Sequence, residues 1–198
     1  NDPTKDSIYN GADDNASGTT GMLLMAESFA KTKLKPKRSM VFLAFSGEEK
    51  GLLGSEAFTN TPPLPLENCV AMLNMDMIGR GENDSLCIGG NTRCKELADL
   101  NELENNQLEK PFSLHYNIEN FFFRSDQANF AKKKIPVLFY FTGEHKDYHK
   151  VTDEIAKINF IDLVRITKLC ARTAWKTASI DERLPYTPQK SDNMEIIH

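Results

Sequence analysis

The sequence has no C-x-x-C pair and no long apolar run, and each absence excludes a class of protein. Its four cysteines, Cys69, Cys87, Cys94 and Cys170, follow no metal-binding spacing, so we expect no zinc–thiolate site. Whether they form disulfides stays open. No stretch approaches the roughly 18 to 20 apolar residues that span a bilayer, and no signal peptide precedes Asn1.

Basic charge is also scarce. The 198 residues carry 24 Lys and Arg against 28 Asp and Glu, a net charge of -4. Because nucleic acids and anionic membranes attract basic surfaces, we expect neither as a partner. A chain of this length with 40% hydrophobic residues can bury an ordinary core. We expect one domain over 1–198, with 184–198 as a tail or an edge segment.

The spacing of apolar residues predicts alternating helices and strands. Helical periodicity covers 17–30, 55–59, 93–107, 125–133 and 159–177. Short runs that are apolar on both faces predict strands at 40–45, 70–75, 86–88, 112–116 and 135–141. This alternation predicts an α/β three-layer sandwich, in which helices flank a mixed, mostly parallel sheet. The short connection between Met75 and Leu86 predicts an antiparallel relation within it.

Metal-type ligands follow several of these strands. Glu48 and Glu49, Asp76, and Tyr148-His149 each lie at or beyond the carboxyl end of a predicted strand, where α/β sheets form their ligand crevices. The pair Asp13-Asp14 opens the first helix. Carboxylates and a histidine without cysteine favour an open Zn²⁺ site, and manganese or cobalt would also fit.

The arrangement also predicts how these ligands divide the chemistry. A carboxylate has two oxygens, so one aspartate can bridge two ions about 3.5–4 Å apart, as in two-metal hydrolases. Glu48 and Glu49 are neighbours, and in a tight loop one can bind metal while the other takes a proton from water. A metallohydrolase is the chemistry that this pattern favours.

Four segments in this order, GADDNASG (11–18), GEEKGLLGS (47–55), NMDM (74–77) and DYHK (147–150), resemble the catalytic half of the M28 family of metallopeptidases, the co-catalytic zinc aminopeptidases. The resemblance runs from about Ile8 to Ile180. The first two segments are highly specific to that family, and the other two are supportive. The fold implied is the zinc exopeptidase sandwich.

The resemblance implies a role for each matching residue. Asp14 falls on the ligand that bridges two zinc ions, and Glu49 and His149 fall on the remaining ligands of one of them. Asp76 falls on a ligand of the other zinc. Glu48 falls on the general base.

Two further segments are less closely matched. Tyr148 falls on a tyrosine that in some members donates to the developing oxyanion, although packing against the crevice wall is an equal interpretation. The segment Arg124–Gln127 resembles one that reads Ser-Asp-His in relatives. Because Gln127 departs from it, we assign this segment only to the pocket wall, with Asp126 as a supporting group behind the ligands.

The main departure lies upstream of Gly11. Family members carry a His-x-Asp segment on a strand there, and its histidine completes the second zinc site. The residues before Gly11 contain no histidine, and His115, His145 and His198 do not lie in the right place; we expect His145 to be a loop residue. The chain is therefore expected to lack the first strands and to hold one zinc well and the second weakly or not at all.

Three functions follow from this resemblance. The leading hypothesis is a zinc aminopeptidase acting on peptides, although this truncated chain is expected to be poorly active. A glutaminyl-cyclase-like acyl transfer with one zinc is the second, and a catalytically silent peptidase-like binding module is the third. Family resemblance also predicts export to the periplasm or medium. Side-chain specificity, amino- or carboxypeptidase action and oligomeric state stay open.

Overall fold

A four-stranded mixed sheet forms the centre of the molecule. The computed structural model describes residues 6–193. The strands are β1 (Met72–Met75), β2 (Ser85–Gly89), β3 (Ser113–His115) and β4 (Val137–Phe141), in the order β1-β4-β2-β3. β1 is parallel to β4 and β2 to β3, whereas β2 and β4 are antiparallel. The mixed, mostly parallel sheet is confirmed. β1 and β2, the strands expected to be antiparallel, run in opposite directions, and β4 lies between them.

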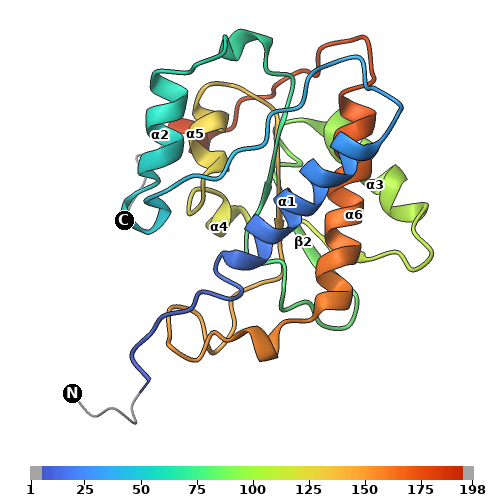
Figure 1. Cartoon of the computed structure of the whole chain (residues 1–198). Helices are drawn as coiled ribbons and strands as arrows, with labels where there is room; N and C mark the ends of the chain where they lie inside the picture. Colours follow the sequence, from blue (N-terminus) through green and yellow to red (C-terminus); the bar gives the residue numbers. More distant parts are fainter. Residues whose placement is uncertain (1–5, 194–198) are drawn as a thin grey trace.

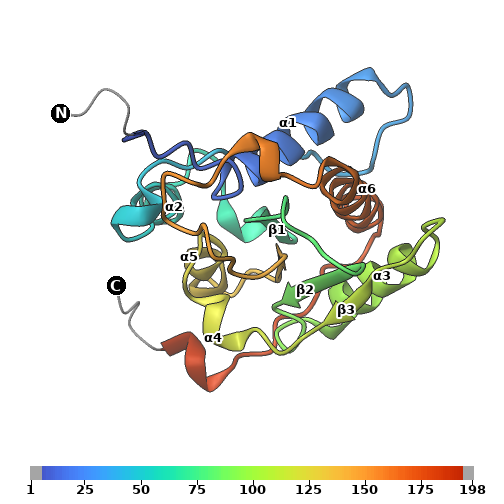
Figure 2. The ribbon, with the colours of Figure 1, turned by 90° about the horizontal axis from the view of Figure 1, so that it is seen from below.

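Helices cover both faces of this sheet (Figure 1). One group contains α1 (Ala16–Lys31), α3 (Lys95–Asn106) and α6 (Phe160–Thr177), and the other contains α2 (Leu53–Asn60), α4 (Glu119–Phe122) and α5 (Gln127–Lys132). Figure 2 shows the two groups on opposite sides of the strands. The expected three-layer α/β sandwich is therefore confirmed, and only the short α4 was not predicted.

Strand β4 is the most deeply buried element, because its side chains alternate between two layers. Leu138 and Tyr140 belong to the core cluster that includes α1, α3 and α6. Val137 packs with α4 and α5, and Phe139 and Phe141 form a third cluster on that side. All five residues are buried. A strand covered by helices on both faces requires this continuous apolar run.

The run Met40–Phe45 forms no strand, so that prediction was wrong. No hydrogen bond joins the backbone of residues 40–45 to another residue in the described part of the chain. A cavity of about 1170 Å³ is lined by residues 38–45 and also by residues 70–76, which include β1. Apolar sequence alone does not make a strand, since a strand also needs a neighbour that pairs with its backbone.

The segment expected as a tail or an edge lies against the rest of the domain as far as residue 193. Leu184 is buried in the main core cluster. The guanidinium of the fully buried Arg93 donates to Asp192 (2.8 Å) and to Glu119 (2.6 Å). Residues 194–198 lie outside the described range. Among the described helices, none is long and apolar enough to cross a membrane.

Helix α1 meets the end of β1 at a glycine. The side chain of Asn15 caps the helix by accepting from Gly18 N (3.0 Å) and donates to Met75 O (3.1 Å). A Cβ atom on Gly18 would collide with Met75 O and would lie 2.5 Å from Asn15 Oδ1. This close approach places the loop before α1 beside the end of β1, next to Asp76.

We therefore expect Gly18→Ala to destabilise the fold by about 1–3 kcal/mol, because the added methyl group has no space. Thr20→Ala, at an exposed position of the same helix, should change the stability by less than about 0.5 kcal/mol. Urea unfolding of the two variants measures the difference. Equal stability of Gly18→Ala and the parent chain would contradict the packing described here.

Candidate metal centre

Three predicted ligands meet at one end of the sheet. Asp14 precedes α1, Glu49 lies in the 3₁₀ turn Glu48–Lys50, and His149 lies in the turn after β4. His149 Nε2 is 3.2 Å from Asp14 Oδ2 and 3.1 Å from Glu49 Oε2. One ligand atom from each residue lies within 4.8 Å of the other two. Donors about 2.0–2.2 Å from one zinc ion would be separated by distances of this order.

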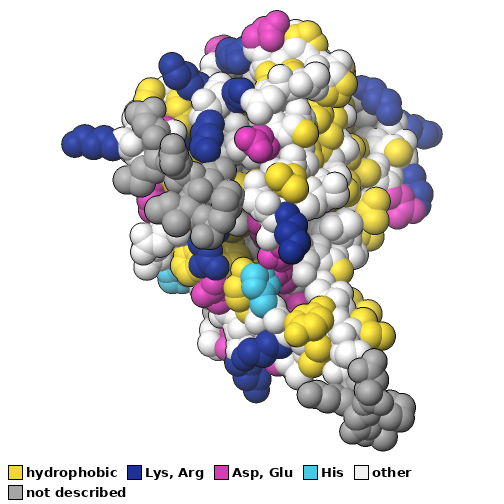
Figure 3. All heavy atoms as spheres, turned by 90° about the vertical axis from the view of Figure 1, so that its left-hand side faces the viewer, with side chains coloured by type: hydrophobic (Ala, Val, Ile, Leu, Met, Phe, Trp, Pro, Cys, Tyr) yellow, Lys and Arg dark blue, Asp and Glu magenta, His cyan; other side chains and the backbone are white. Residues whose placement is uncertain are grey.

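The centre opens to solvent on one side. The side chain of His149 is 50% exposed and that of Glu49 is 54% exposed, whereas that of Asp14 is 13% exposed. On the face seen in Figure 3, a histidine side chain lies beside acidic side chains. An ion held here would keep an open position, which catalytic zinc sites require.

A tight turn separates the two adjacent glutamates. Gly47 and Gly51 bracket it with φ angles of 70° and 101°, which glycine adopts without strain. Glu49 extends to His149, whereas Glu48 lines a small cavity of about 30 Å³ together with Asp14 and Asp76. Such a cavity has room for about one or two water molecules.

Asp76 follows β1 and is held from two sides. Its backbone N–H donates to Tyr140 O (3.1 Å), and Ser125 Oγ donates to its Oδ2 (2.6 Å). Asn74 in turn donates to Ser125 (2.9 Å). The other carboxylate oxygen, Oδ1, is buried and has no hydrogen-bond partner among the described residues. A buried carboxylate oxygen without a donor calls for a proton or a cation.

Carboxylates crowd this end of the sheet. Burial, followed by the charges of Asp76 and Glu49, raises the pKa of Asp14 to about 8. Burial, followed by the charge of Asp76, raises the pKa of Glu48 to about 8. Burial raises the pKa of Asp76 to about 6. In the part of the chain that the structure describes, no lysine or arginine forms an ion pair with these four acids.

The position of Tyr148 is compatible with both of its expected roles, donation to the oxyanion and packing against the crevice wall. Its ring stacks on His149 with centroids 3.7 Å apart and packs against the cluster around Phe139 and Phe141. It also lines the small cavity beside Glu48. Burial, followed by the charge of Asp14, raises the pKa of its phenol to about 12. The hydroxyl therefore keeps its proton at neutral pH.

The segment Arg124–Gln127 divides between support and cavity wall. Arg124 and Ser125 line the small cavity, and Asp126 lines the large one. Gln127 is fully buried and lines neither; its Oε1 accepts from Asn74 (2.7 Å) and its Nε2 donates to Phe122 O (2.6 Å). Gln127, the residue that departs from the family pattern, thus supports β1, the strand that ends just before Asp76.

His145 lies in a loop, as expected, but its side chain is largely buried and contacts Asp13. Its Nε2 lies 3.1 Å from Oδ2 of Asp13, and its side chain is only 12% exposed. Its Nδ1 accepts the N–H of Asp147, so we assign the proton to Nε2. Asp13 is fully buried and also accepts from Gly79 N (2.6 Å). The only sequence signal for this contact was the spacing of four residues between His145 and His149.

The second proposed metal position has fewer ligands. Apart from Asp14, Glu49 and His149, no group of three or more metal-type side chains converges among the described residues. His145 is paired with Asp13, and His115 lies in β3. Asp14 and Asp76 therefore meet at the small cavity without a histidine from residues 6–193.

The chain is similar in sequence to a protein named as a zinc metalloprotease and in structure to one named as an aminopeptidase. A probable zinc metalloprotease of Pyrenophora tritici-repentis is 27% identical over 212 residues, covering 85% of this chain and 44% of the relative. The structure of an aminopeptidase from Aneurinibacillus sp. strain AM-1 matches with a TM-score of 0.73 and 23% identity, over 90% of this chain and 42% of that one. The chain thus spans less than half of either protein.

A third match bears on the alternative chemistry. The crystal structure of Porphyromonas gingivalis glutaminyl cyclase has a TM-score of 0.65 and 16% identity, over 85% of this chain and 64% of that one. At these identities the two structural matches show the fold alone. The sequence model of Peptidase family M28, however, matches residues 2–174. Since that match covers most of the sequence, the chain belongs to peptidase family M28.

Proposed function

We propose that this chain is the catalytic part of a zinc exopeptidase that removes the amino-terminal residue of peptides. The observation that carries the proposal is the meeting of Asp14, Glu49 and His149 at the end of the sheet, with ligand atoms within 4.8 Å of one another. Two carboxylates and an imidazole are a donor set that suits zinc. The names of the matched zinc metalloprotease and aminopeptidase support the same metal and reaction.

Glu48 is the proposed general base. When bound, zinc supplies a Lewis acid that polarises the scissile carbonyl and makes water more acidic. Glu48 shares the small cavity with Asp14 and Asp76, so its carboxylate can take the proton of the attacking water and pass it to the leaving amine. In the metal-free chain, burial and the charge of Asp76 raise the pKa of Glu48 to about 8, and the charge of a bound ion would lower it again.

Tyr148 is proposed to stabilise the tetrahedral oxygen as well as to pack. Its phenol is protonated at neutral pH, as a donor to an oxyanion must be, and it lines the same cavity as Glu48. The rings of Phe121, Phe139 and Phe141 line this cavity too and give it an apolar wall. We propose that this wall contacts the side chain of the substrate.

The second ion is proposed to need a ligand from elsewhere. Asp14 and Asp76 offer carboxylates, and Asp76 Oδ1 is without a donor, but no described histidine joins them. The large cavity beside residues 40–45 and β1 also includes Asp14 and Asp76 in its lining. We propose that the upstream strand implied by the resemblance would lie in this cavity and carry the missing histidine.

Two other functions remain as alternatives. The single three-ligand site also suits glutaminyl-cyclase-like acyl transfer, and one structural match bears that name. A glutaminyl peptide separates the two reactions, because pyroglutamate without a released amino acid would favour the cyclase.

A silent binding module would have no chemical reason to keep Glu48 beside the ligands. Export stays a prediction from the family resemblance.

Glu48→Gln should lower peptide hydrolysis by the full-length protein by about 10²–10⁴-fold, because the amide cannot accept the proton. Zinc content should be unchanged, since Glu48 is not among the three converging ligands. The matched control is Glu56→Gln, at an exposed position of α2, which should keep the parent rate. Unchanged hydrolysis by Glu48→Gln would rule out the base assignment.

Residues 1–198 should hold one zinc ion tightly, and the position between Asp14 and Asp76 should be weak or empty. Elemental analysis after dialysis measures the number of ions per chain. His149→Ala should abolish tight binding, whereas His115→Ala, at an exposed position of β3, should leave it unchanged. Two tightly held ions in the parent chain would contradict the proposed incomplete second site.

The stability of the metal-free chain should fall as pH rises from about 4 to about 8. Asp14, Glu48 and Asp76 have raised pKa values in the fold, so over this range the folded chain keeps protons that the unfolded chain has lost. Zinc replaces those protons, and its affinity rises with pH. Thermal midpoints with zinc and with chelator should therefore diverge as pH rises; a constant difference would contradict the crowding of these acids.

A further inference from the structure

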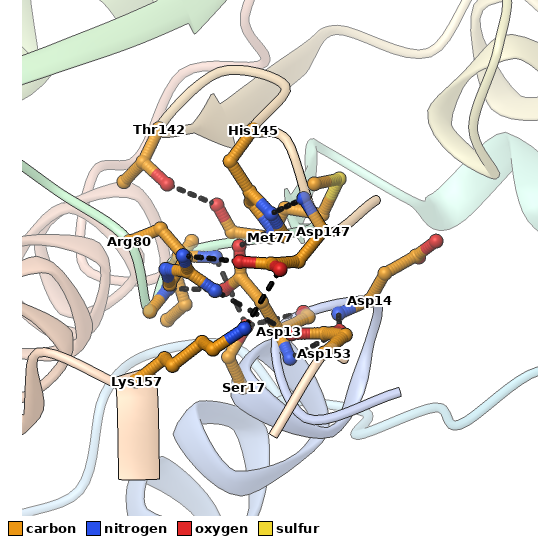
Figure 4. A network of polar contacts seen from close by, with 12 residues as sticks. Asp13, Asp14, Ser17, Met77, Arg80, Thr142, His145, Asp147, Asp153 and Lys157 are labelled. Carbon is orange, nitrogen blue, oxygen red and sulfur yellow. Dashed lines mark hydrogen bonds and ion pairs between the residues drawn. The ribbon is translucent and has the colours of Figure 1, made fainter. Parts of the chain in front are cut away.

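A buried network of charged side chains lies behind the proposed zinc ligands (Figure 4). It contains three aspartates, Asp13, Asp147 and Asp153, whose exposed fractions are 0%, 4% and 2%. Two cations, Arg80 and Lys157, neutralise part of this charge. None of the five is a ligand, so the network can act on the centre only through the loops that carry the ligands.

Asp153 holds the loop that carries Asp14. Its Oδ2 accepts the backbone N–H groups of both Asp13 (2.9 Å) and Asp14 (3.1 Å). Its own carbonyl accepts the N–H of Ala12 (3.3 Å). Three consecutive peptide groups therefore take their position from one buried residue, and the direction of the Asp14 side chain depends on it.

Asp147 holds the turn that carries His149. Its Oδ1 accepts from Thr152 Oγ1 (2.7 Å) and from Lys157 Nζ (2.7 Å), and its carbonyl accepts the N–H of Lys150 (3.0 Å). The hydrogen bonds from Lys157, Thr152 and Arg80 hold the pKa of Asp147 well below its usual range. His149 lies within this turn at a φ of 55°, so it depends on the turn being kept closed.

Arg80 lies between these two aspartates. Its Nη2 donates to Asp147 Oδ2 (3.0 Å), and its Nη1 is 3.7 Å from Asp153 Oδ1. Both Arg80 Nη1 and Asp153 Oδ1 are buried, and neither atom has a hydrogen-bond partner among residues 6–193. Each is therefore the nearest polar partner of the other, at a distance slightly longer than a hydrogen bond.

The backbone fixes where this guanidinium can lie. Arg80 follows the stretch that leaves β1 after Asp76, and the neighbouring Gly79 donates to Asp13 Oδ1 and accepts from Asn159 N (2.7 Å). A planar guanidinium can serve two carboxylates at once with fixed geometry, which a lysine ammonium cannot do. The positions of Asp76, of the loop that carries Asp14 and of the turn that carries His149 therefore all depend on the segment that leaves the end of β1.

From this arrangement we infer that Arg80 is a positioning residue for the zinc centre: it ties the Asp14 loop, through Asp153, to the His149 turn, through Asp147. The inference rests on the proposed zinc function of Asp14, Glu49 and His149. Without the guanidinium, Asp147 would keep only Lys157 as a cation, and Asp153 would keep none from the described residues. The two loops would then separate, and Asp14 and His149 would lose their 3.2 Å approach.

The test compares zinc affinity, measured by competition with a chelator, in the full chain and in Arg80→Met. We expect the zinc dissociation constant to rise by about 10–100-fold, the usual effect of removing a group behind the ligands. The absorption spectrum of the cobalt-substituted protein should change as well, because the ligand geometry changes. Arg80→Lys should recover only part of the affinity.

Arg165→Met is the matched control. Arg165 is also largely buried, at 19% exposure against 15% for Arg80, and it also pairs with two aspartates, Asp84 and Asp162. It lies in α6, and the hydrogen bonds of its side chain within residues 6–193 go to Asp84, Asp162 and Lys110, none of which lies in a ligand loop. We expect it to lower the thermal midpoint without changing zinc affinity or the cobalt spectrum.

If Arg80→Met does not fold, Arg80→Lys and Asp153→Asn carry the test. The asparagine can still accept the backbone N–H groups, but it removes the ion pair with Arg80 Nη1 and leaves Arg80 paired with Asp147 alone. Parent zinc affinity in the folded variants would overturn the inference. His149→Ala separates this result from a failure of the proposed function. If His149→Ala also keeps parent affinity, the zinc site itself is wrongly assigned; if it alone loses zinc, only the role of Arg80 fails.

Discussion

Repulsion between carboxylates at one end of the sheet is the constraint on which the rest of this centre depends. Burial, followed by the charges of neighbouring carboxylates, raises the pKa values of Asp14, Glu48 and Asp76. A fold that needed only stability would separate them or pair them with lysine or arginine. The unpaired oxygen of Asp76 shows the same imbalance. A cation bound by Asp14 and Glu49 would offset part of this charge, and such a site agrees with the family assignment.

The acids behind the centre, in contrast, have hydrogen-bond donors or cations as partners. Asp147 has Lys157, Thr152 and Arg80 as partners, and Asp153 accepts two backbone N–H groups. Two sets of carboxylates therefore lie within one region, one set supplied with donors and the other left without cations. Because an unpaired buried charge is costly, the difference supports the proposed division between carboxylates that act on a ligand and carboxylates that support the backbone.

The sequence predicted those parts of the fold that depend on local pattern. Helix α6 and strand β4 follow from the spacing and length of their apolar runs. The ligand roles of Asp14, Glu49 and His149 were implied by the family resemblance of the motifs that contain them. The run 40–45 failed because strand formation depends on a partner that its own residues do not reveal. The sequence did not reveal the contacts of His145, Asp153 and Arg80 for a related reason. These residues lie in irregular loops, where buried positions do not recur at a regular spacing in the sequence. Their importance becomes visible only when three loops are seen together.

The three proposed ligands belong to different layers of the sandwich. Asp14 is attached to α1 on one face of the sheet. Glu49 is attached to α2 on the other, since Gly54 N and Leu53 N donate to the carbonyls of Ser46 and Gly47. The segment 40–45 that leads into this turn forms no backbone hydrogen bonds with the described residues, so the α2 side is joined to the sheet there by packing alone. A metal ion that binds Asp14 and Glu49 would therefore link the two layers directly, and it would contribute to the stability of the domain as well as to its chemistry.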